Sequence, residues 1–328
     1  MNELALNALL KKLDFDKIES LTRLSGGASQ ETWRIQICYT SNTSLILRLA
    51  PLCATQRAAG SAGLANEAAL LTLAHRHGLP VPRVHHVCTP EDHLGDGYLM
   101  QDCPGETLGQ RIARHADFTA ARTHLAYDCG HALARIHALP HALPPAACPP
   151  LRTAFAREEL AHYEAQHRAI STPRPVFEVA LRWLREHMPS APAAASLVHG
   201  DFRNGNLVVT PNGLSAILDW ELAHFGDPME DLGWISVNAW RFGQRNLPVG
   251  GFGTREQLFA GYTAAGGTVD AERVRYWEVL GTLKWGIICE GMGAAFSSGA
   301  EPTIERAVIG RRASETEIDL LDLLVPRT

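Results

Sequence analysis

The chain has 328 residues, of which 46% are apolar and 20% charged, so it can form two modest domains or lobes with buried cores. Its formal charge of −5 is mild, and no run of Lys or Arg carries interleaved aromatic residues, which disfavours a nucleic-acid partner. The seven cysteines are scattered without a Cys-x-x-Cys pair, a spacing that favours reduced thiols over a zinc ribbon or a disulfide framework.

The N-terminal segment lacks the order of a secretory signal, because Lys11 and Lys12 follow its apolar residues instead of preceding them. No apolar stretch reaches the roughly 20 residues that a membrane-spanning helix needs. The sequence therefore predicts a cytoplasmic protein with no membrane partner.

The first hundred residues predict a strand-rich lobe with one helix over residues 66–77, preceded by a short amphipathic helix that ends near Phe15. Trp33 and Ile35 alternate with polar residues, the period of two that is typical of a half-buried strand. Residues 45–50 predict the returning strand of a hairpin, because turn residues separate the two. A further short apolar strand is expected over residues 98–100.

Beyond a hinge near residues 101–105 the pattern becomes helical. Leu125, Cys129, Leu133 and Ile136 recur at helical spacing and predict a long, largely apolar helix. The chain is therefore expected to be an α+β protein with a small β-rich lobe and a larger helical lobe. The remaining segments expected here are a proline-rich connector over residues 140–150 and helices over residues 154–168, 176–188 and 273–292.

One segment gathers side chains suited to metal and phosphate chemistry. An apolar strand leads into the loop 199–206, whose sequence is His-Gly-Asp-Phe-Arg-Asn-Gly-Asn. Strands are expected over residues 207–209 and 216–218 with a tight turn between them, so the hairpin brings this loop beside Asp219. Two carboxylates and one carboxamide meet there, and these are the hard oxygen ligands that Mg²⁺ prefers.

This set of side chains suits phosphoryl transfer, which needs an oriented hydroxyl, metal charge across the phosphates and basic groups near the transferred group. Asp201 is the candidate that accepts the hydrogen bond of the attacking hydroxyl. Asn206 and Asp219 are the candidate metal ligands, and Arg203 is expected to point its guanidinium at the transferred group. His199 is expected to orient the loop backbone rather than to move a proton.

Three motifs in this part of the chain resemble one known family. They are His-Gly-Asp-x-x-x-x-Asn at residues 199–206, Asp-Trp-Glu at residues 219–221 and Gly-Asp-Pro-Met-Glu-Asp-Leu at residues 226–232. Together they resemble the aminoglycoside phosphotransferase and choline kinase-like family, relatives of the protein kinases. Within the last motif, Asp227 and Asp231 are expected to cap a helix and to tie the loop together.

The resemblance extends over residues 24–290 and is closest to the branch in which such a segment is fused to acyl-CoA dehydrogenases. It implies a kinase that uses ATP and Mg²⁺ to phosphorylate a hydroxyl group of a small molecule. It also implies a bilobal protein-kinase-like fold, with an antiparallel nucleotide-binding lobe at residues 1–102 and a helical catalytic and acceptor-binding lobe at residues 103–328.

The nucleotide side is assigned by the same resemblance. A glycine-bearing turn would cover the phosphates with its backbone N–H groups, and the hinge backbone would bind the adenine. An ordinary linker at the hinge is equally compatible with the sequence. The residues assigned to the nucleotide are Gly26, Gly27, Ala28 and Ser29 in the turn, Arg48 and Glu67, and Gln101 and Cys103 in the hinge.

Arg48 departs from the family pattern, because most relatives place Lys at this position and pair it with a helix Glu that here is Glu67. A cation between Leu47 and Leu49 is either a solvated edge residue or a phosphate ligand. Arg forms a wider, bidentate fork than Lys. The departure leaves open a catalytically weak or inactive kinase-like module that only binds a nucleotide.

The acceptor is left open by the sequence. A polycationic aminoglycoside needs a cluster of carboxylates in the helical lobe, whereas resemblance to the dehydrogenase-fused branch suggests a hydroxy acid or a hydroxyacyl thioester. Trp285 and Glu290 are candidates for the lining of an acceptor pocket. The acidic residues considered for binding a polycation are Glu301, Glu305, Glu315, Glu317 and Asp319.

Overall fold

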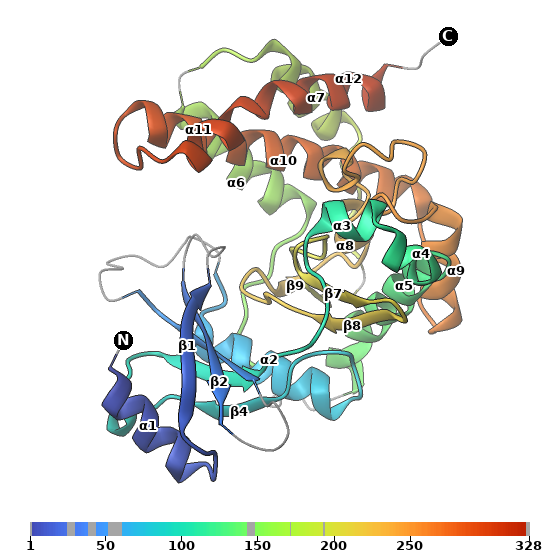
Figure 1. Ribbon diagram of the computed structural model, residues 1–328. Coiled ribbons are helices and arrows are strands. Elements are labelled where there is room, and N and C mark those ends of the chain that lie inside the picture. The colour runs from blue at the N-terminus through green and yellow to red at the C-terminus, as the bar shows by residue number, and fades with distance from the viewer. Residues whose placement is uncertain are drawn as a thin grey trace.

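The computed structural model describes residues 2–24, 30–38, 44–51, 61–142, 148–170, 172–192 and 194–325. The chain forms a small lobe built on a five-stranded sheet and a larger helical lobe that carries short two-stranded sheets (Figure 1). The predicted α+β, two-lobed organisation is confirmed. Among the described residues, no helix combines the length and the apolar character that crossing a membrane requires.

The sheet of the small lobe is antiparallel throughout, with the strand order β1-β2-β3-β5-β4. The predicted hairpin is formed by β2 and β3, in which Trp33 lies opposite Leu47. The strands are β1 (Ile18–Leu24), β2 (Glu31–Ile37), β3 (Ser44–Leu49), β4 (Val84–Val87) and β5 (Gly97–Gln101). The helices are α1 (Glu3–Lys12) and α2 (Leu64–Arg76), and Pro90–Asp92 forms a 3-10 turn.

Strand β3 separates two cores, because successive side chains of a strand point to opposite faces. Leu45, Leu47 and Leu49 pack in one core with the leucines of α1, whereas Ile46 packs in the other core with α2. The side chain of Arg48 belongs to the second face and lines a cleft. Since β3 is a central strand, Arg48 is not a solvated edge residue.

Strand β1 was not predicted, because its apolar residues do not alternate. Ile18, Leu21 and Leu24 recur at every third position, a spacing closer to that of a helix. The strand lies at the edge of the sheet, and its pairing with β2 is irregular between Ile18 and Ser20. An irregular edge strand needs apolar contacts on only part of one face, so the sequence pattern is weak.

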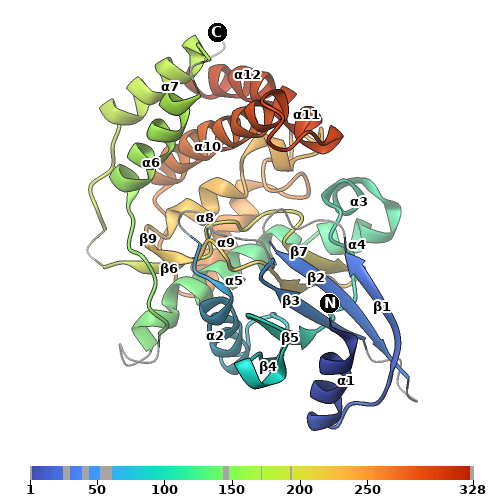
Figure 2. The same ribbon diagram turned by 90° about the vertical axis from the view of Figure 1, so that its left-hand side faces the viewer.

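The helical lobe is arranged around the long helix α10, which packs against α6, α7, α8, α11 and α12 (Figures 1 and 2). The helices predicted over residues 154–168, 176–188 and 273–292 are confirmed as α6, α7 and α10, and the long apolar helix is α5. The helices of this lobe are α3 (Gly109–Arg114), α4 (Thr119–Arg122), α5 (Leu125–Ala138), α6 (Ala156–Ala169), α7 (Pro175–Glu186), α8 (Met229–Trp234), α9 (Arg255–Ala264), α10 (Ala271–Ser297), α11 (Ile304–Arg311) and α12 (Ala313–Leu324).

The predicted hairpin after the loop 199–206 is formed by β7 (Leu207–Thr210) and β8 (Gly213–Ile217), while β6 (Ser196–Val198) pairs with β9 (His224–Gly226). The chain that leaves the hinge runs along β7. Glu106 and Val209 exchange two backbone hydrogen bonds, of 2.8 and 2.9 Å. Gly105, with φ of 145°, allows this approach, since a Cβ atom there would lie 2.6 Å from Val208. The hinge and the loop are thereby held together.

Candidate active site

The backbone of the loop 199–206 is fixed by one buried carboxylate. Asp231 on α8 accepts hydrogen bonds from the backbone N–H groups of His199, at 2.8 Å, and Gly200, at 2.9 Å. His137 Nε2 lies 3.0 Å from the same carboxylate, and its Nδ1 lies 2.8 Å from the Tyr262 hydroxyl. Burial alone would raise the pKa of Asp231, but the hydrogen bond and charge of His137 hold it below its usual value. The predicted tying role of Asp231 is confirmed.

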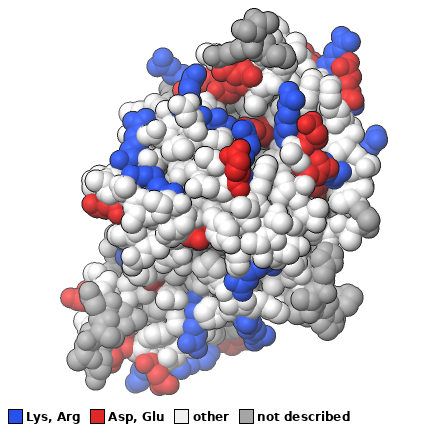
Figure 3. Space-filling model, turned by 90° about the vertical axis from the view of Figure 1, so that its right-hand side faces the viewer, with Lys and Arg blue, Asp and Glu red and all other residues white. Residues whose placement is uncertain are grey.

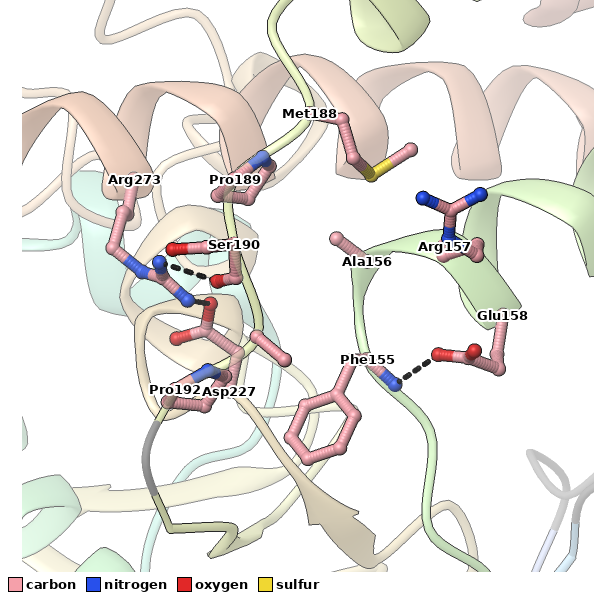
Figure 4. Close-up of a pocket in the computed structure, with 11 residues that line it drawn as sticks. Phe155, Ala156, Arg157, Glu158, Met188, Pro189, Ser190, Pro192, Asp227 and Arg273 are labelled. Carbon is pink, nitrogen blue, oxygen red and sulfur yellow. Dashed lines mark hydrogen bonds and ion pairs between the residues drawn. The ribbon is translucent and has the colours of Figure 1, made fainter.

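Asp227 supports the same region from the start of α8. Its Oδ1 accepts the backbone N–H of Met229, the first residue of α8, at 3.0 Å, although the N-cap position itself is Pro228 and not Asp227 as predicted. Arg273 forms an ion pair with Asp227 and donates to the backbone oxygen of Ser190 at 2.8 Å (Figure 4). The hollow of about 250 Å³ beside this pair is lined by no residue of the loop 199–206. Asp227 therefore fixes the start of α8 and its contact with Arg273 of α10.

His199 is buried and joins the loop to the end of β8. Its Nδ1 accepts the backbone N–H of Asp201 at 3.2 Å, so the ring proton is on Nε2, which lies 3.0 Å from the backbone oxygen of Leu218. Burial lowers the pKa of His199, although the charge of Asp231 opposes this. A neutral imidazole that bonds two backbone groups agrees with the predicted orienting role.

Asn206 holds the carboxylate of Asp201. Its Nδ2 donates to Asp201 Oδ2 at 2.6 Å and to the backbone oxygen of Asp201 at 2.9 Å. Because both amide hydrogens are used in this way, the amide oxygen of Asn206 faces away from Asp201. The backbone oxygen of Asn206 accepts the N–H of Leu218 at 2.8 Å, so the end of β8 lies directly beside the loop.

Asp219 follows β8 and adopts φ of 62°, a left-handed conformation that is uncommon for residues other than Gly. Its side chain is 30% exposed and lines a cleft together with Asn206. The structure thus brings the two predicted metal ligands to the same cleft. An amide oxygen and a carboxylate are hard oxygen donors, so these residues fit Mg²⁺.

Arg203 lies beside Asp201, and its predicted role at the transferred group stays a prediction. Its Nε donates to Asp201 Oδ1 at 2.9 Å, and its Nη1 donates to the backbone oxygen of Asn204 at 2.9 Å. The guanidinium also lies over the ring of Trp240, 4.6 Å from its centroid. Arg203 therefore contacts the carboxylate of Asp201 on one side and a ring of the helical lobe on the other.

Arg48 donates to three side chains, and the one that lies in the other lobe is Asp219. Its Nη1 donates to Glu67 at 2.7 Å, its Nη2 to Asp219 at 3.0 Å and its Nε to Gln30 at 2.9 Å. Gln30 in turn donates to Glu221 at 3.2 Å. The predicted pair of Arg48 and Glu67 is confirmed in its geometry, while its contact with Asp219 was not predicted.

Burial and the neighbouring charges act in opposite directions on the pKa of each member of this pair. Burial raises the pKa of Glu67 to about 7, although the charge of Arg48 opposes the rise. Glu67 Oε1 also accepts the backbone N–H of Trp220 at 3.2 Å, while Oε2 is buried without a hydrogen-bond partner among the described residues. Burial alone would lower the pKa of Arg48, but Tyr98 and the two carboxylates keep it raised. Arg48 is therefore charged at every ordinary pH.

A cleft of about 290 Å³ lies between the sheet, the hinge and the loop. Both predicted hinge residues, Gln101 and Cys103, line it, as do Arg48 and the two predicted metal ligands. The predicted phosphate-covering residues Gly26, Gly27, Ala28 and Ser29 lie outside the described residues. The apolar side chains of the lining are Leu24, Ile46, Met100, Val208 and Leu218.

Two side chains that contact the loop escaped the sequence analysis. Trp234 Nε1 donates to Asp201 Oδ1 at 2.8 Å, and Lys284 Nζ donates to the backbone oxygen of Gly200 at 3.2 Å. They lie 33 and 84 residues from their partners, so no local spacing points to them. A lysine inside an otherwise apolar stretch of α10 was the only available signal.

The residues considered for the acceptor pocket are mostly engaged elsewhere. Glu290 is buried, 2.8 Å from His167 Nδ1 and 3.1 Å from Arg174 Nε. The ring of Trp285 packs 4.9 Å from that of Trp240. Four of the five acids considered for a polycation are paired, as Glu301 with Arg306, Glu315 with Arg312, Glu317 with Arg174 and Asp319 with Asn238.

The family model and the two-lobed fold place the chain in the kinase-like class of small-molecule phosphotransferases. More particularly, the chain belongs to the phosphotransferase enzyme family, whose model matches residues 20–270. The predicted family and the bilobal kinase-like fold are thereby confirmed.

Solved structures agree with this fold over nearly the whole chain. A structure from Ralstonia eutropha assigned to the aminoglycoside phosphotransferases has a TM-score of 0.73 and 20% identity, covering 98% of this chain and 97% of its own. A choline/ethanolamine kinase family protein from Mesorhizobium loti has a TM-score of 0.65 and 20% identity, covering 99% and 94%. An aminoglycoside phosphotransferase in complex with ADP and hygromycin B has a TM-score of 0.61 and 16% identity, covering 98% and 99%. At such identities the likeness shows the fold alone.

The curated relatives are longer proteins. Acyl-CoA dehydrogenase family member 10 of Mus musculus is 28% identical over 225 residues, which cover 65% of this chain and 20% of that protein. Acyl-CoA dehydrogenase family member 11 of Homo sapiens is 26% identical over 180 residues, covering 52% and 22%. The chain therefore spans about a fifth of the length of these relatives.

Proposed function

We propose that the chain transfers a phosphoryl group from ATP to a hydroxyl group of a small molecule in a reaction that depends on Mg²⁺. The observation that carries the proposal is that Asn206 and Asp219 line one cleft while Asn206 also holds the carboxylate of Asp201. The hydrogen bond of 2.6 Å between Asn206 and Asp201 and the bond of 2.8 Å from Leu218 to Asn206 fix this meeting. An acid, an amide and a second acid in this arrangement are what phosphoryl transfer requires.

Asp201 is proposed to orient the acceptor hydroxyl. The hydroxyl donates a hydrogen bond to the carboxylate, and its proton moves to Asp201 as the new oxygen–phosphorus bond forms. The bond between the terminal phosphorus and the bridging oxygen breaks, and ADP leaves. Arg203 and Trp234 hold Asp201 Oδ1, at 2.9 and 2.8 Å, so the carboxylate has a fixed direction before the acceptor arrives.

The amide oxygen of Asn206 and the carboxylate of Asp219 are proposed to hold Mg²⁺. When bound, the ion would neutralise charge on the phosphates and on the departing ADP. Within the chain, Asn206 contributes in a second way, because its amide hydrogens keep Asp201 in place. A change at Asn206 should therefore affect both metal binding and the direction of Asp201.

The nucleotide is proposed to occupy the cleft of about 290 Å³ between the sheet and the loop. Arg48, positioned by Glu67, would bind the phosphates, and the backbone at Gln101 and Cys103 would bind the adenine. Gly26, Gly27, Ala28 and Ser29, which lie outside the described residues, are proposed to contact the phosphates. A related structure solved with ADP supports the use of ATP. We propose residues 1–102 as the nucleotide-binding lobe and residues 103–328 as the catalytic and acceptor-binding lobe.

The surroundings of Asp201 favour a neutral or anionic acceptor. Arg203 lies over Trp240, whose ring packs against Trp285, and buried Lys284 reaches the loop from α10. The acids that could bind a polycation are mostly paired with other side chains, so they are less available to ammonium groups. We propose a hydroxy acid or a hydroxyacyl thioester, which carries a negative charge or carbonyl oxygens, over an aminoglycoside.

We further propose that the chain acts in the cytoplasm and on small molecules. On the face of the molecule shown in Figure 3, Lys and Arg lie among Asp and Glu rather than in one continuous basic surface. Such mixed charge gives little attraction for a polyanion on that face. The membrane and nucleic-acid partners that the sequence disfavours are accordingly left out of the proposal.

The test is a screen of hydroxylated molecules for ADP release, with hydroxy acids, hydroxyacyl thioesters, amino alcohols, sugars and an aminoglycoside as the panel. We expect one class to stimulate Mg²⁺-dependent ADP release. Asp201→Asn should lower the stimulated rate by about 10³-fold, since it removes the proton acceptor. Asp117→Asn, a change at an exposed acid of the helical lobe, should leave the rate unchanged.

Two results would count against the proposal, one against the role of Asp201 and one against transfer itself. Wild-type turnover by Asp201→Asn would remove the residue from the chemistry. Calorimetric binding of Mg·ATP without stimulation by any class would instead favour the nucleotide-binding module that lacks transfer activity.

A further inference from the structure

Lys284 is a buried cation directly beneath the loop 199–206. It lies on α10, is 6% exposed, and its Nζ donates to the backbone oxygen of Gly200 at 3.2 Å. That oxygen belongs to the peptide group that joins Gly200 to Asp201, whose N–H donates to His199 at 3.2 Å. Both polar atoms of this one peptide group are thus bound by buried side chains, and the peptide cannot rotate without losing both bonds.

The same cation contacts a second support of Asp201. Lys284 Nζ lies 4.6 Å from the centroid of the Trp234 ring, and the indole Nε1 of Trp234 donates to Asp201 Oδ1 at 2.8 Å. A cation over an indole face is attracted to the ring and holds its plane in place. It also draws electron density from the ring, which strengthens the N–H as a donor. Lys284 therefore acts on both the backbone and the carboxylate of Asp201.

The charge on Lys284 is balanced by its surroundings. Burial alone would lower the pKa of Lys284, but Tyr163, Glu230 and Glu159 keep it raised, so the amine is protonated. Glu159 forms an ion pair with Arg152, and Glu230 Oε2 lies 3.2 Å from His224 Nε2. The ring of Tyr163 lies on a further side of the ammonium group, at 5.4 Å. Burying a charged lysine costs desolvation free energy, so we look for a role of this charge in the proposed reaction.

We propose that Lys284 is a positioning residue for phosphoryl transfer: it fixes the Gly200–Asp201 peptide and the Trp234 indole so that the Asp201 carboxylate points at the acceptor hydroxyl. The inference rests on the proposed function, since it assigns the charge a purpose in that reaction. Lys284 itself does not touch the residues that line the nucleotide cleft. Its loss should therefore change the chemical step more than the binding of ATP.

The first test compares three variants in the ADP-release assay. Lys284→Met has a similar shape without the charge, and we expect kcat to fall by about 10- to 100-fold while KM for ATP changes by less than about threefold. Lys284→Arg restores a charged donor and should recover most of the lost kcat. Arg255→Met is the matched control, because it removes a cation from the buried carboxylate of Glu278 on the same helix without contacting the loop.

The second test does not depend on turnover. Amide hydrogen exchange of a peptide that covers residues 197–206 should become faster in Lys284→Met, because the loop backbone loses a bond. Lys284→Arg and Arg255→Met should keep the wild-type exchange rate. If the wild-type chain phosphorylates no acceptor, the proposed function fails, and the exchange measurement still shows whether Lys284 fixes the loop.

A double-mutant cycle completes the design. Trp234→Phe keeps an aromatic ring beside Lys284 but removes the indole N–H that donates to Asp201. If Lys284 acts through Trp234, the two changes are not additive. The kcat of the double variant, Lys284→Met with Trp234→Phe, should then be no more than about threefold below that of the slower single variant.

The inference would be overturned by a kcat of Lys284→Met within about twofold of wild type, or by unchanged loop exchange in that variant. Equal losses in Lys284→Met and in the control Arg255→Met would also overturn it, because they would indicate general destabilisation. If Lys284→Met does not accumulate as folded protein, Lys284→Gln takes its place with the same expected and contrary results.

Discussion

The loop 199–206 and the cluster around Arg48 face the same cleft but are built in opposite ways. The loop is held by its own lobe, since Asp231, Lys284 and Trp234 all reach it from helices of that lobe. Arg48 instead joins the lobes, because it bonds Glu67 in the small lobe and Asp219 beside the loop. One region is fixed before any ligand binds, and the other depends on how the lobes meet.

This difference corresponds to two tasks in the proposed reaction, the chemical step and the binding of the nucleotide. Groups that act on the developing bond must be fixed in advance, which describes the surroundings of Asp201. Groups that grip a nucleotide must let it enter and leave. Asp219 belongs to both regions, because it bonds Arg48 at 3.0 Å and is proposed to hold the metal. Binding of Mg·ATP is therefore expected to redistribute the bonds of Arg48 while leaving the loop unchanged.

The largest expected effect comes from removing the charge of the shared residue. Asp219→Asn should lower acceptor-dependent ADP release by about 10³-fold, because the metal loses its charged ligand. Titration with Mg²⁺ should show a higher half-saturating concentration than in wild type. The exchange rate of the loop backbone should remain that of wild type. A loop that loosens in Asp219→Asn would contradict the separation of the two regions.

The loop was predictable because its members are close in sequence. The hairpin of β7 and β8 returns the chain to Asn206, so the position of Asp219 follows from strand lengths and one turn. Turn residues and alternating apolar positions carry this information locally. The same reasoning predicted the β2–β3 hairpin and the strand that carries Arg48, whereas the central position of that strand in the sheet came from the structure.

The supports of the loop could not be predicted, because tertiary packing brings them in. Trp234 and Lys284 lie 33 and 84 residues from the groups that they bond. Which face of α10 meets the loop depends on how α6 and α8 pack beside it, and no local pattern sets this. The contact of Arg48 with Asp219 depends likewise on the arrangement of the lobes.

A smaller effect is expected at Arg48 itself. Arg48→Lys keeps the charge but loses the fork, so KM for ATP should change by about 3- to 10-fold while kcat falls less. Arg48→Met leaves the buried carboxyl of Glu67 without its cation and should lower the free energy of unfolding by about 3 kcal/mol. Steady-state kinetics and urea unfolding measure the two effects. A change in kcat with constant KM in Arg48→Lys would place Arg48 in the chemical step instead.

The smallest effect is a difference in pH dependence between the regions. The pKa of Glu67 is raised in the folded chain to about 7, so its contribution to stability is present at low pH and is lost as the pH rises toward 7. The pKa of His199 is lowered, so its contribution is present above its unfolded pKa of about 6.5 and is lost as the pH falls. The two regions thus respond to acid in opposite directions.

Urea midpoints at about pH 7.5 and about pH 5.5 would separate these contributions. On acidification, Glu67→Gln should lose more stability than wild type, because the gain from protonating Glu67 is absent. His199→Gln should lose less stability than wild type. Glutamine, unlike the buried histidine, takes up no proton when the chain unfolds at low pH. The same pH response in all three chains would show that neither group is shifted on folding.

Direct detection of the phosphorylated acceptor tests the central claim most closely. With Mg·ATP and the molecule that stimulates ADP release, phosphorus NMR of the wild-type reaction should show one new phosphomonoester for each ADP formed. Asp201→Asn should form both the phosphomonoester and ADP about 10³-fold more slowly than wild type. ADP that accumulates with inorganic phosphate alone, or equal amounts of phosphomonoester from Asp201→Asn, would contradict the assignment of a phosphotransferase that uses Asp201.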